Sequence, residues 1–136
     1  MSNRTIHLGY IHMSSWTSKS RLADDYYFDE ADSYYDSPHA KKVHALDPNG
    51  VVLTKGTYTL KITYPLSRPF MAVMDVEKSG MTRRQLVSWI VKSYKAIYRK
   101  AGTTNPNGVW GHAMWDLMLH TATVSKKGVI NVVCDS

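Results

Sequence analysis

Cysteine is almost absent from this chain of 136 residues, since the sequence contains only Cys134. A single cysteine cannot form an internal disulfide. Cys134 lies in the apolar run VINVVC, where a buried thiol behaves as a small hydrophobic side chain. We therefore expect a reduced, intracellular protein whose thiol is neither reactive nor catalytic, because no neighbouring base or helix start is apparent to lower the pKa of the thiol.

Long apolar runs are also missing. No stretch approaches the ~20 consecutive apolar residues that a membrane-spanning helix needs. The first residues, MSNRTIHLGYIHMSSW, lack the apolar core of a secretory signal. We expect a soluble protein with no membrane partner, and a 43% hydrophobic share is enough for one domain with one core.

Acidic residues are scarce over most of the chain. Residues 37–136 carry fourteen bases and five acids, although the net charge of the whole chain is only +6. The other acids lie in one segment without a base: Asp24, Asp25, Asp29, Glu30, Asp32 and Asp36. The chain thus divides into an acidic, Tyr-rich arm (1–40) and a basic body (41–136), and this asymmetry favours an anionic partner or self-association.

The arm contains two Tyr-Tyr pairs, Tyr26-Tyr27 and Tyr34-Tyr35, within ADDYYFDEADSYYDS. This segment is too acidic for a core strand and too aromatic for ordinary disorder, so we expect its rings to lie on another surface. That surface is either the domain's own sheet or a partner, such as a second copy or another protein. Tyrosine suits both, because one end of its side chain can be buried while the other stays wet.

Alternating patterns predict strands in the body. In TYTLKITY (57–64) and PFMAVMDVE (69–77), every second residue is suited to a core. The sequence DPNG at 47–50 predicts a hairpin turn in which Gly50 takes a positive φ. The apolar alternation on both sides of SKKG (125–128) predicts a closing hairpin, whereas the first 22 residues show no clear period.

The segment TRRQLVSWIVKSYKAIYRKAG predicts a helix over about 83–101. Thr82 and Gln85 form a capping box at its start, and Gly102 provides a stop. One stripe is suited to the core: Leu86, Trp89, Ile90, Ser93 and Ile97. The helix holds six bases and no acid: Arg83, Arg84, Lys92, Lys95, Arg99 and Lys100.

The order of these elements is strands, one long helix and then two strands. Consecutive hairpins favour an α+β fold over repeated βαβ units. We expect an antiparallel sheet, built from hairpins, that packs against the amphipathic helix.

The stretch GVWGHAMWDLMLH contains the strongest candidates for chemistry, His112, Asp116 and His120. On a helix, His112 and Asp116 would be neighbours, but about 12 Å of helix axis would separate His112 from His120. If the chain becomes a strand near Leu117, His120 turns away. One His-Asp pair lacks the third ligand of a metal site. We favour a structural His112-Asp116 hydrogen bond and keep acid/base or metal use as the alternative; no metal or cofactor is expected.

Three tryptophans bear on function: Trp89, Trp110 and Trp115. In a short domain such rings usually pack in the core. The alternative is an exposed ring beside the basic helix, which would resemble a groove for single-stranded nucleic acid.

Four motifs, TYPLSRPF, SGMTRRQLVSWIVKSYKAIY, NGVWGHAMWDLMLHTATV and the closing CDS, together resemble a family of small, mostly uncharacterised proteins of giant DNA viruses (Marseillevirus-like). The resemblance covers about residues 58–136 and implies a fold and a viral source more than a chemistry. Two positions depart from the family pattern, because Ala113 stands where Asp, Asn or Gly is usual and His120 where Glu is usual. Fewer acids make an enzyme less expected.

We therefore expect a non-enzymatic accessory or virion-associated protein, located in the host cytoplasm, nucleus or virus factory. In this interpretation the six helix bases bind the backbone of DNA or RNA, because clustered Lys and Arg supply a sequence-independent attraction. The main alternative is a protein-interaction module that docks through Tyr26, Tyr27, Tyr34 and Tyr35, with a second copy, to form a homodimer, or with another viral or host protein as its partner. The third is an enzyme centred on His112 and Asp116.

Overall fold

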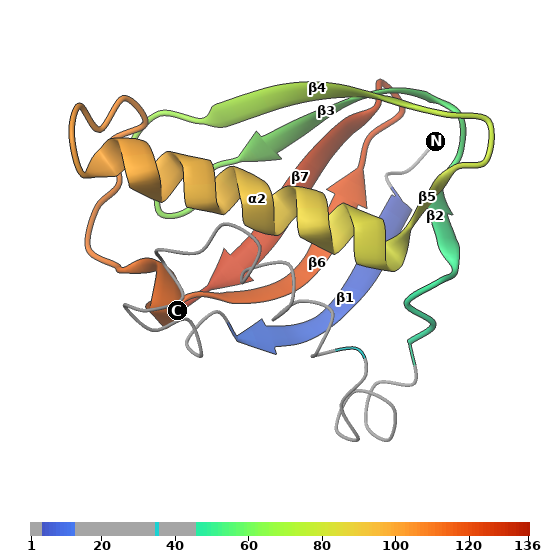
Figure 1. The fold of residues 1–136 in the computed structure, drawn as a ribbon, viewed down its shortest axis with the longest axis horizontal. Coiled ribbons are helices and arrows are strands. Elements are labelled where there is room, and N and C mark those ends of the chain that lie inside the picture. The colour runs from blue at the N-terminus through green and yellow to red at the C-terminus, as the bar shows by residue number, and fades with distance from the viewer. Residues whose placement is uncertain (1–3, 13–34, 36–45) are drawn as a thin grey trace.

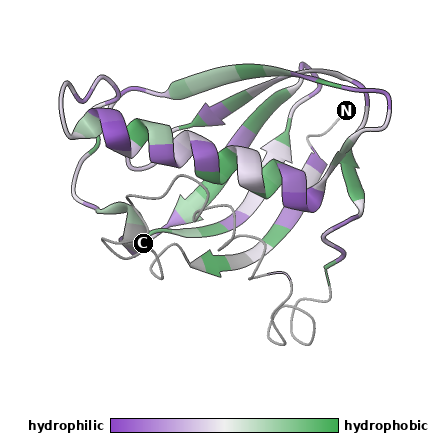
Figure 2. Ribbon diagram, in the orientation of Figure 1, coloured by the Kyte–Doolittle hydropathy of each residue, from purple (hydrophilic) through white to green (hydrophobic). Residues whose placement is uncertain are grey.

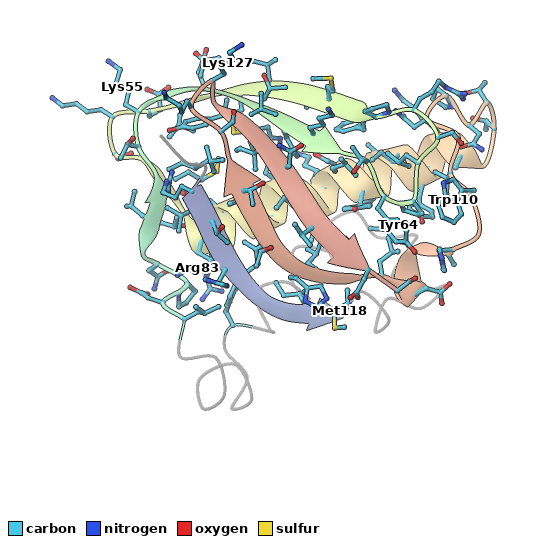
Figure 3. All side chains as sticks on the ribbon, turned by 180° about the vertical axis from the view of Figure 1, so that it is seen from behind. Lys55, Tyr64, Arg83, Trp110, Met118 and Lys127 are labelled. Atoms are coloured by element: carbon cyan, nitrogen blue, oxygen red, sulfur yellow. The ribbon has the colours of Figure 1, made fainter. Side chains whose placement is uncertain are left out.

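A computed structural model describes residues 4–12, 35 and 46–136, and it confirms an α+β fold in which a helix packs on a sheet (Figure 1). Helix α2 crosses one face of the sheet. The opposite face, seen from behind in Figure 3, has no helix over it in the described part of the chain. The elements are β1 (Arg4–His12), β2 (Val51–Leu53), β3 (Gly56–Ile62), β4 (Phe70–Val76), β5 (Met81–Thr82), α2 (Arg83–Ala101), a 3-10 helix (Met114–Asp116), β6 (Met118–Val124) and β7 (Val129–Asp135).

The main sheet has the strand order β1-β6-β7-β3-β4, and a small second sheet joins β2 to β5. All neighbouring strands are antiparallel except β3 and β7, which are parallel and pair Thr59 with Val129 and Lys61 with Asn131. The sheet is therefore mixed and not wholly antiparallel as expected. The cause is the crossover: α2 carries the chain back along the sheet between the two hairpins, so β7 runs beside β3 in the same direction.

The core lies between α2 and the sheet. Leu60 and Ile62 of β3 are fully buried, as are Leu86 and Ile90 of α2, which confirms the two predicted periods. In Figure 2 green, hydrophobic segments alternate with hydrophilic ones on the helix and on the strands of the main sheet behind it. On β4 the predicted alternation also holds, since Val76 is buried whereas Met71, Val73 and Asp75 are exposed.

Helix α2 begins and ends at the predicted residues. The Gln85 amide donates to Thr82 Oγ1 at 3.2 Å, and the Thr82 amide donates to Gln85 Oε1 at 2.9 Å, so the capping box is formed. Gly102 is the C-cap but keeps a right-handed φ of −71°. The left-handed residue comes later, at Asn105 (φ 48°), because the amides of residues 103–105 all donate to the Lys100 carbonyl and extend the turn.

Replacing Thr82 with alanine should destabilise the protein by about 1 kcal/mol, because one of the first amides of α2 loses its side-chain acceptor. Urea unfolding followed by circular dichroism measures this change. Ser88→Ala is the matched control within the same helix, and it should not destabilise, since alanine has the higher helix propensity. An equal loss in both variants would contradict a capping role for Thr82.

The turn predicted at 47–50 forms, but the pairing of strands on both sides of it stays a prediction. The Gly50 amide donates to the Asp47 carbonyl at 3.3 Å, and Asp47 Oδ1 accepts from the Asn49 amide at 2.9 Å. Gly50 does not take the positive φ that we expected. The strand after this turn, β2, pairs with β5, whereas residues 36–45 before it lie outside the described part of the chain. The closing hairpin at 125–128 is confirmed.

Strand β1 forms the edge of the main sheet beside β6, although the first residues showed no period. Its buried residues are Ile6, Leu8 and Ile11. The remainder of the arm, 13–34 and 36–40, lies outside the described residues, so its placement stays a prediction. Within the described residues, no helix is both long and apolar enough to cross a membrane.

Candidate functional site

Arg83, at the start of α2, joins three parts of the chain. Its Nε donates to the His7 carbonyl at 2.8 Å, and its Nη1 donates to the Asp47 carbonyl. These bonds connect the helix start to β1 and to the turn at 47–50. Because two of its donor nitrogens serve backbone carbonyls, Arg83 acts as a structural clamp and contributes less to an open basic face than the sequence suggested.

Arg84 lies over an aromatic ring of the arm. Its guanidinium carbon is 5.9 Å from the centroid of the Tyr35 ring, a cation-π geometry. Tyr35 is 2% exposed, and its hydroxyl donates to the Leu8 carbonyl at 2.8 Å. Tyr35 therefore packs on the protein's own body, whereas Tyr26, Tyr27 and Tyr34 lie outside the described residues.

Lys95 is buried, with 8% of its surface exposed, which corrects the expectation that it lies on the solvent face of α2. It follows Val87 and Val91 at intervals of four residues, and both valines are fully buried. The buried surface of the helix is thus wider than the single predicted stripe. Of the six predicted cations, Lys92, Arg99 and Lys100 are exposed, and Arg83 and Arg84 are partly buried.

Four lysines gather at one end of the sheet, which we call the lysine end: Lys55, Lys78, Lys126 and Lys127. All four are exposed. Gly56 pairs with Val76, which places Lys55 near the turn that carries Lys78. The Thr59 amide donates to the Gly128 carbonyl at 2.9 Å, which places the Lys126-Lys127 turn against the start of β3. Figure 3 shows Lys55 and Lys127 at the same end of the molecule.

The charges at the lysine end are not neutralised by ion pairs within the described residues. Two ion pairs are seen among the described residues, His112-Asp116 and His120-Asp135. Neither pair involves a lysine. Two acids lie nearby, of which Asp75 accepts a hydrogen bond from Thr57 Oγ1 at 2.6 Å and Glu77 is exposed. The sequence did carry a signal: each of the four lysines lies in a short turn with a glycine, namely TKG, EKSG or SKKG.

His112 and Asp116 are neighbours but do not form the expected hydrogen bond. His112 Nδ1 and Asp116 Oδ2 are 3.9 Å apart, beyond hydrogen-bond distance. Asp116 Oδ2 instead accepts from the Ala113 amide at 3.1 Å, where it helps to cap the 3-10 helix. His120 lies elsewhere, since its Nε2 is 2.8 Å from Asp135 Oδ2, so the series of three is broken as expected.

The second ring nitrogen of His112 has an unexpected neighbour. His112 Nε2 is 3.3 Å from Ser136 Oγ, which in turn is 2.8 Å from the Tyr64 hydroxyl. A carboxylate, an imidazole and a hydroxyl thus lie in sequence, but the gap between Asp116 and His112 leaves the imidazole without the hydrogen bond that orients such a base. Among the described residues, no group of three or more His, Cys, Asp or Glu side chains could hold a metal ion.

Trp110 belongs to an exposed ring cluster, which consists of Tyr64, Trp110 and His112. Trp110 is 50% exposed, which contradicts core packing for this ring, whereas Trp89 packs against the core as expected. The side chain of Trp115 lies outside the described part. The Tyr64 and Trp110 centroids are 5.7 Å apart at an interplanar angle of 87°, and those of Trp110 and His112 are 5.9 Å apart at 53°. The ring cluster lies opposite the lysine end (Figure 3).

Cys134 is a free, partly buried cysteine next to this region. Its Sγ is 3.7 Å from the Asp135 carbonyl oxygen. Burial raises the pKa of the Cys134 thiol to about 11, and burial also raises the pKa of the Tyr94 and Tyr98 hydroxyls. The thiol is therefore protonated at neutral pH, which opposes a nucleophilic role.

Comparison with protein-family models, with curated proteins and with solved structures finds no match for this chain.

Proposed function

We propose that this protein is a non-enzymatic nucleic-acid-binding protein that contacts the phosphate backbone through the lysine end. The observation that supports this proposal is the convergence of Lys55, Lys78, Lys126 and Lys127 from three turns, without an ion pair among the described residues. Clustered cations attract a phosphate backbone whatever its sequence, because binding releases condensed counterions. An accessory or virion-associated role in a giant virus belongs to the same proposal.

The exposed sheet face next to the lysine end fits this interaction. Thr57, Thr59, Thr123 and Asn131 carry hydroxyl or amide groups on this face, and Lys61 lies between them on β3, paired with Asn131. Such side chains commonly bond to phosphate and sugar oxygens. The strand residues of this face with described side chains include no tryptophan, tyrosine or phenylalanine, and the imidazole of His7 on β1 is a small ring, so the face offers little surface for base stacking. The backbone is therefore the part of the nucleic acid that this surface suits.

The lysine end, and not helix α2, should dominate the salt dependence of binding. Lys126→Gln/Lys127→Gln removes two phosphate contacts. The slope of log K for binding against log salt concentration should therefore become less negative by about 2, and binding at 0.1 M salt should be about 60-fold weaker than that of the native protein. Fluorescence anisotropy with a labelled 15-base-pair duplex over a salt series measures both quantities.

Lys92→Gln/Lys100→Gln is the matched control, because it removes the same charge from exposed positions of α2. We expect it to change the slope by less than half as much. A larger loss in the helix variant would instead support the basic helix as the interface. Absence of binding to any nucleic acid at low salt would refute the proposed function altogether.

A further inference from the structure

We propose that the ring cluster is a stacking site for an unpaired nucleobase, with Trp110 as the platform. This inference rests on the proposed function and deepens it, because it makes single-stranded nucleic acid the preferred ligand. Two features of the ring cluster support this proposal. Its aromatic surface is ordered before binding, and both hydrogen-bond donors and acceptors lie at its edge.

The Trp110 ring is exposed, it contacts the other two rings of the cluster, and the backbone that carries it is hydrogen-bonded. The Trp110 amide donates to the Pro65 carbonyl at 3.1 Å, and Leu66 forms a β-bridge with Val109. Asn105 Oδ1 accepts from the Val109 amide at 2.8 Å, which secures the chain before the tryptophan. A ring that is ordered before binding loses little conformational entropy when it binds a ligand.

The loop that precedes Trp110 is also held by hydrogen bonds from the side chain of Arg68. Arg68 Nε donates to the Pro106 carbonyl at 2.6 Å, and Arg68 Nη2 donates to the Asn105 carbonyl at 3.2 Å. Gly108, with a φ of 62°, leaves room for Ser67, since an added Cβ would come within 2.8 Å of the Ser67 side chain. The platform is thus part of a bonded loop.

The neighbouring rings leave Trp110 available for stacking. Tyr64 meets Trp110 edge to face at 87°, and His112 is tilted by 53°, so neither ring lies parallel to the indole. Half of the side chain remains exposed. Stacking on an aromatic side chain suits every nucleobase, because each base has a π face.

Polar groups around the rings match the edge of a base better than a phosphate. Ser136 Oγ, the Tyr64 hydroxyl and His112 Nε2 form a chain of hydrogen-bonding groups, and they provide both donors and acceptors. The nearby Asp116 carboxylate is exposed and would repel a phosphate. We infer that a base lies at the ring cluster while its backbone runs toward the cationic parts of the surface.

The two proposed sites lie at opposite ends of β3, since Lys55 precedes this strand and Tyr64 follows it. At ~3.3 Å per residue the separation is roughly 25 to 30 Å. A stacked strand advances about 3.4 Å per nucleotide, so roughly eight nucleotides span both sites. A 15-nucleotide strand can reach both sites, whereas a tetranucleotide can reach only one.

The test compares Trp110→Ala with the native protein on a 15-nucleotide oligothymidylate and on a 15-base-pair duplex. Trp110→Ala should weaken binding of the single strand about 5- to 150-fold, because one stacked base is lost, and should change duplex binding less than twofold. Trp110→Tyr should restore most of the affinity, since tyrosine also stacks. Ser88→Ala, at a position of α2 outside both proposed sites, is the control and should change neither affinity.

A second measurement is independent of the lysine end. The indole N–H resonance of Trp110, assigned by its disappearance in Trp110→Phe, should shift when a tetrathymidylate is added. No shift would overturn the stacking site, even if duplex binding supports the proposed function. A shift without any duplex binding would support the stacking site and refute the lysine end. A shift with a neutral oligosaccharide but not with the tetranucleotide would identify a sugar-binding surface and overturn the proposal.

Discussion

Gly128→Ala should destabilise the protein by about 2 to 5 kcal/mol. Gly128 has a φ of 81°, and an added Cβ would lie 2.8 Å from the Thr57 carbonyl oxygen. A left-handed conformation costs an L-residue about 1 to 2 kcal/mol, and overpacking against backbone that cannot move away costs about 1 to 3 kcal/mol more. Urea unfolding measures the change in the free energy of unfolding.

Substitutions at two other glycines distinguish the cost of the left-handed conformation from the cost of the steric overlap. Gly111 has a φ of 71° with nothing within 4 Å of an added Cβ, so Gly111→Ala carries the conformational cost of about 1 to 2 kcal/mol alone. Gly102 has a φ of −71° with ordinary contacts, so Gly102→Ala should be neutral or stabilise the protein by up to about 1 kcal/mol. If Gly128→Ala costs no more than Gly111→Ala, the close approach to β3 is refuted.

This close approach also matters for the proposed function. Gly128 lets the turn that carries Lys126 and Lys127 lie against Thr57 at the start of β3, next to Lys55. A side chain at position 128 would push the turn away from β3 and spread the lysines. Gly128→Ala should therefore weaken duplex binding in addition to lowering stability, at temperatures where the variant is still folded.

The elements that were predictable from sequence depend on short-range patterns. Helix α2 has a capping box and an apolar stripe, both of which are formed by residues a few positions apart. Strands β3 and β4 alternate strictly over seven residues each, and β6 and β7 flank a turn with a glycine. In these segments the local pattern and the tertiary environment agree, so the pattern alone is enough.

Strand β1 was not predictable because its period is interrupted. Ile6 and Leu8 belong to the core at an interval of two, whereas the next of the described hydrophobic core residues, Ile11, follows at an interval of three. The register with β6 shifts between His7 and Ile11, and Gly9 within this bulge has a φ of 97°. Between His7 and Ile11, β1 advances four residues while β6 advances two, so the buried positions of β1 fall at uneven intervals and a search for period two finds no strand here.

The candidate sites required long-range information. The lysine end exists because β3 and β7 pair in parallel, although about 70 residues separate them in sequence. On α2 the sequence identified one buried stripe, whereas Val87, Val91 and Lys95 form a second one that only the surrounding chain can bury. The exposure of Trp110 follows from its place in a loop outside the sheet, which its apolar neighbours in sequence do not reveal.

Raising the pH above 9 should destabilise the protein, beginning with Cys134. Burial raises the pKa of this thiol to about 11 from 9.0, so between these values the unfolded chain releases a proton that the folded protein retains. The contribution of the thiol is complete below pH 9 and is lost as the pH rises through 11. The expected loss is about 1.4 kcal/mol by pH 10 and about 2 kcal/mol by pH 11.

The buried tyrosines extend this loss to higher pH. Burial raises the pKa of Tyr94 and of Tyr98 above the ordinary 10.0, so the unfolded chain ionises first at these positions too. Their hydroxyls donate to the carbonyls of Tyr64 and His112, and ionisation would remove the donated proton from both bonds. The free energy of unfolding should therefore fall more steeply above pH 10 than between pH 9 and 10.

Cys134→Ala isolates the contribution of the thiol. At pH 7 the variant should be less stable than the native protein, because packing around the sulfur is lost. By pH 10 the difference in unfolding free energy should be about 1.4 kcal/mol smaller than at pH 7, since only the native protein is destabilised by ionisation of the thiol in its unfolded chain. Val132→Ala, a buried neighbour on β7 with no ionisable group, should show a difference that does not change with pH. If the Cys134→Ala difference is equally constant, the thiol is not held protonated by the fold, and the alkaline loss of stability must come from the tyrosines alone.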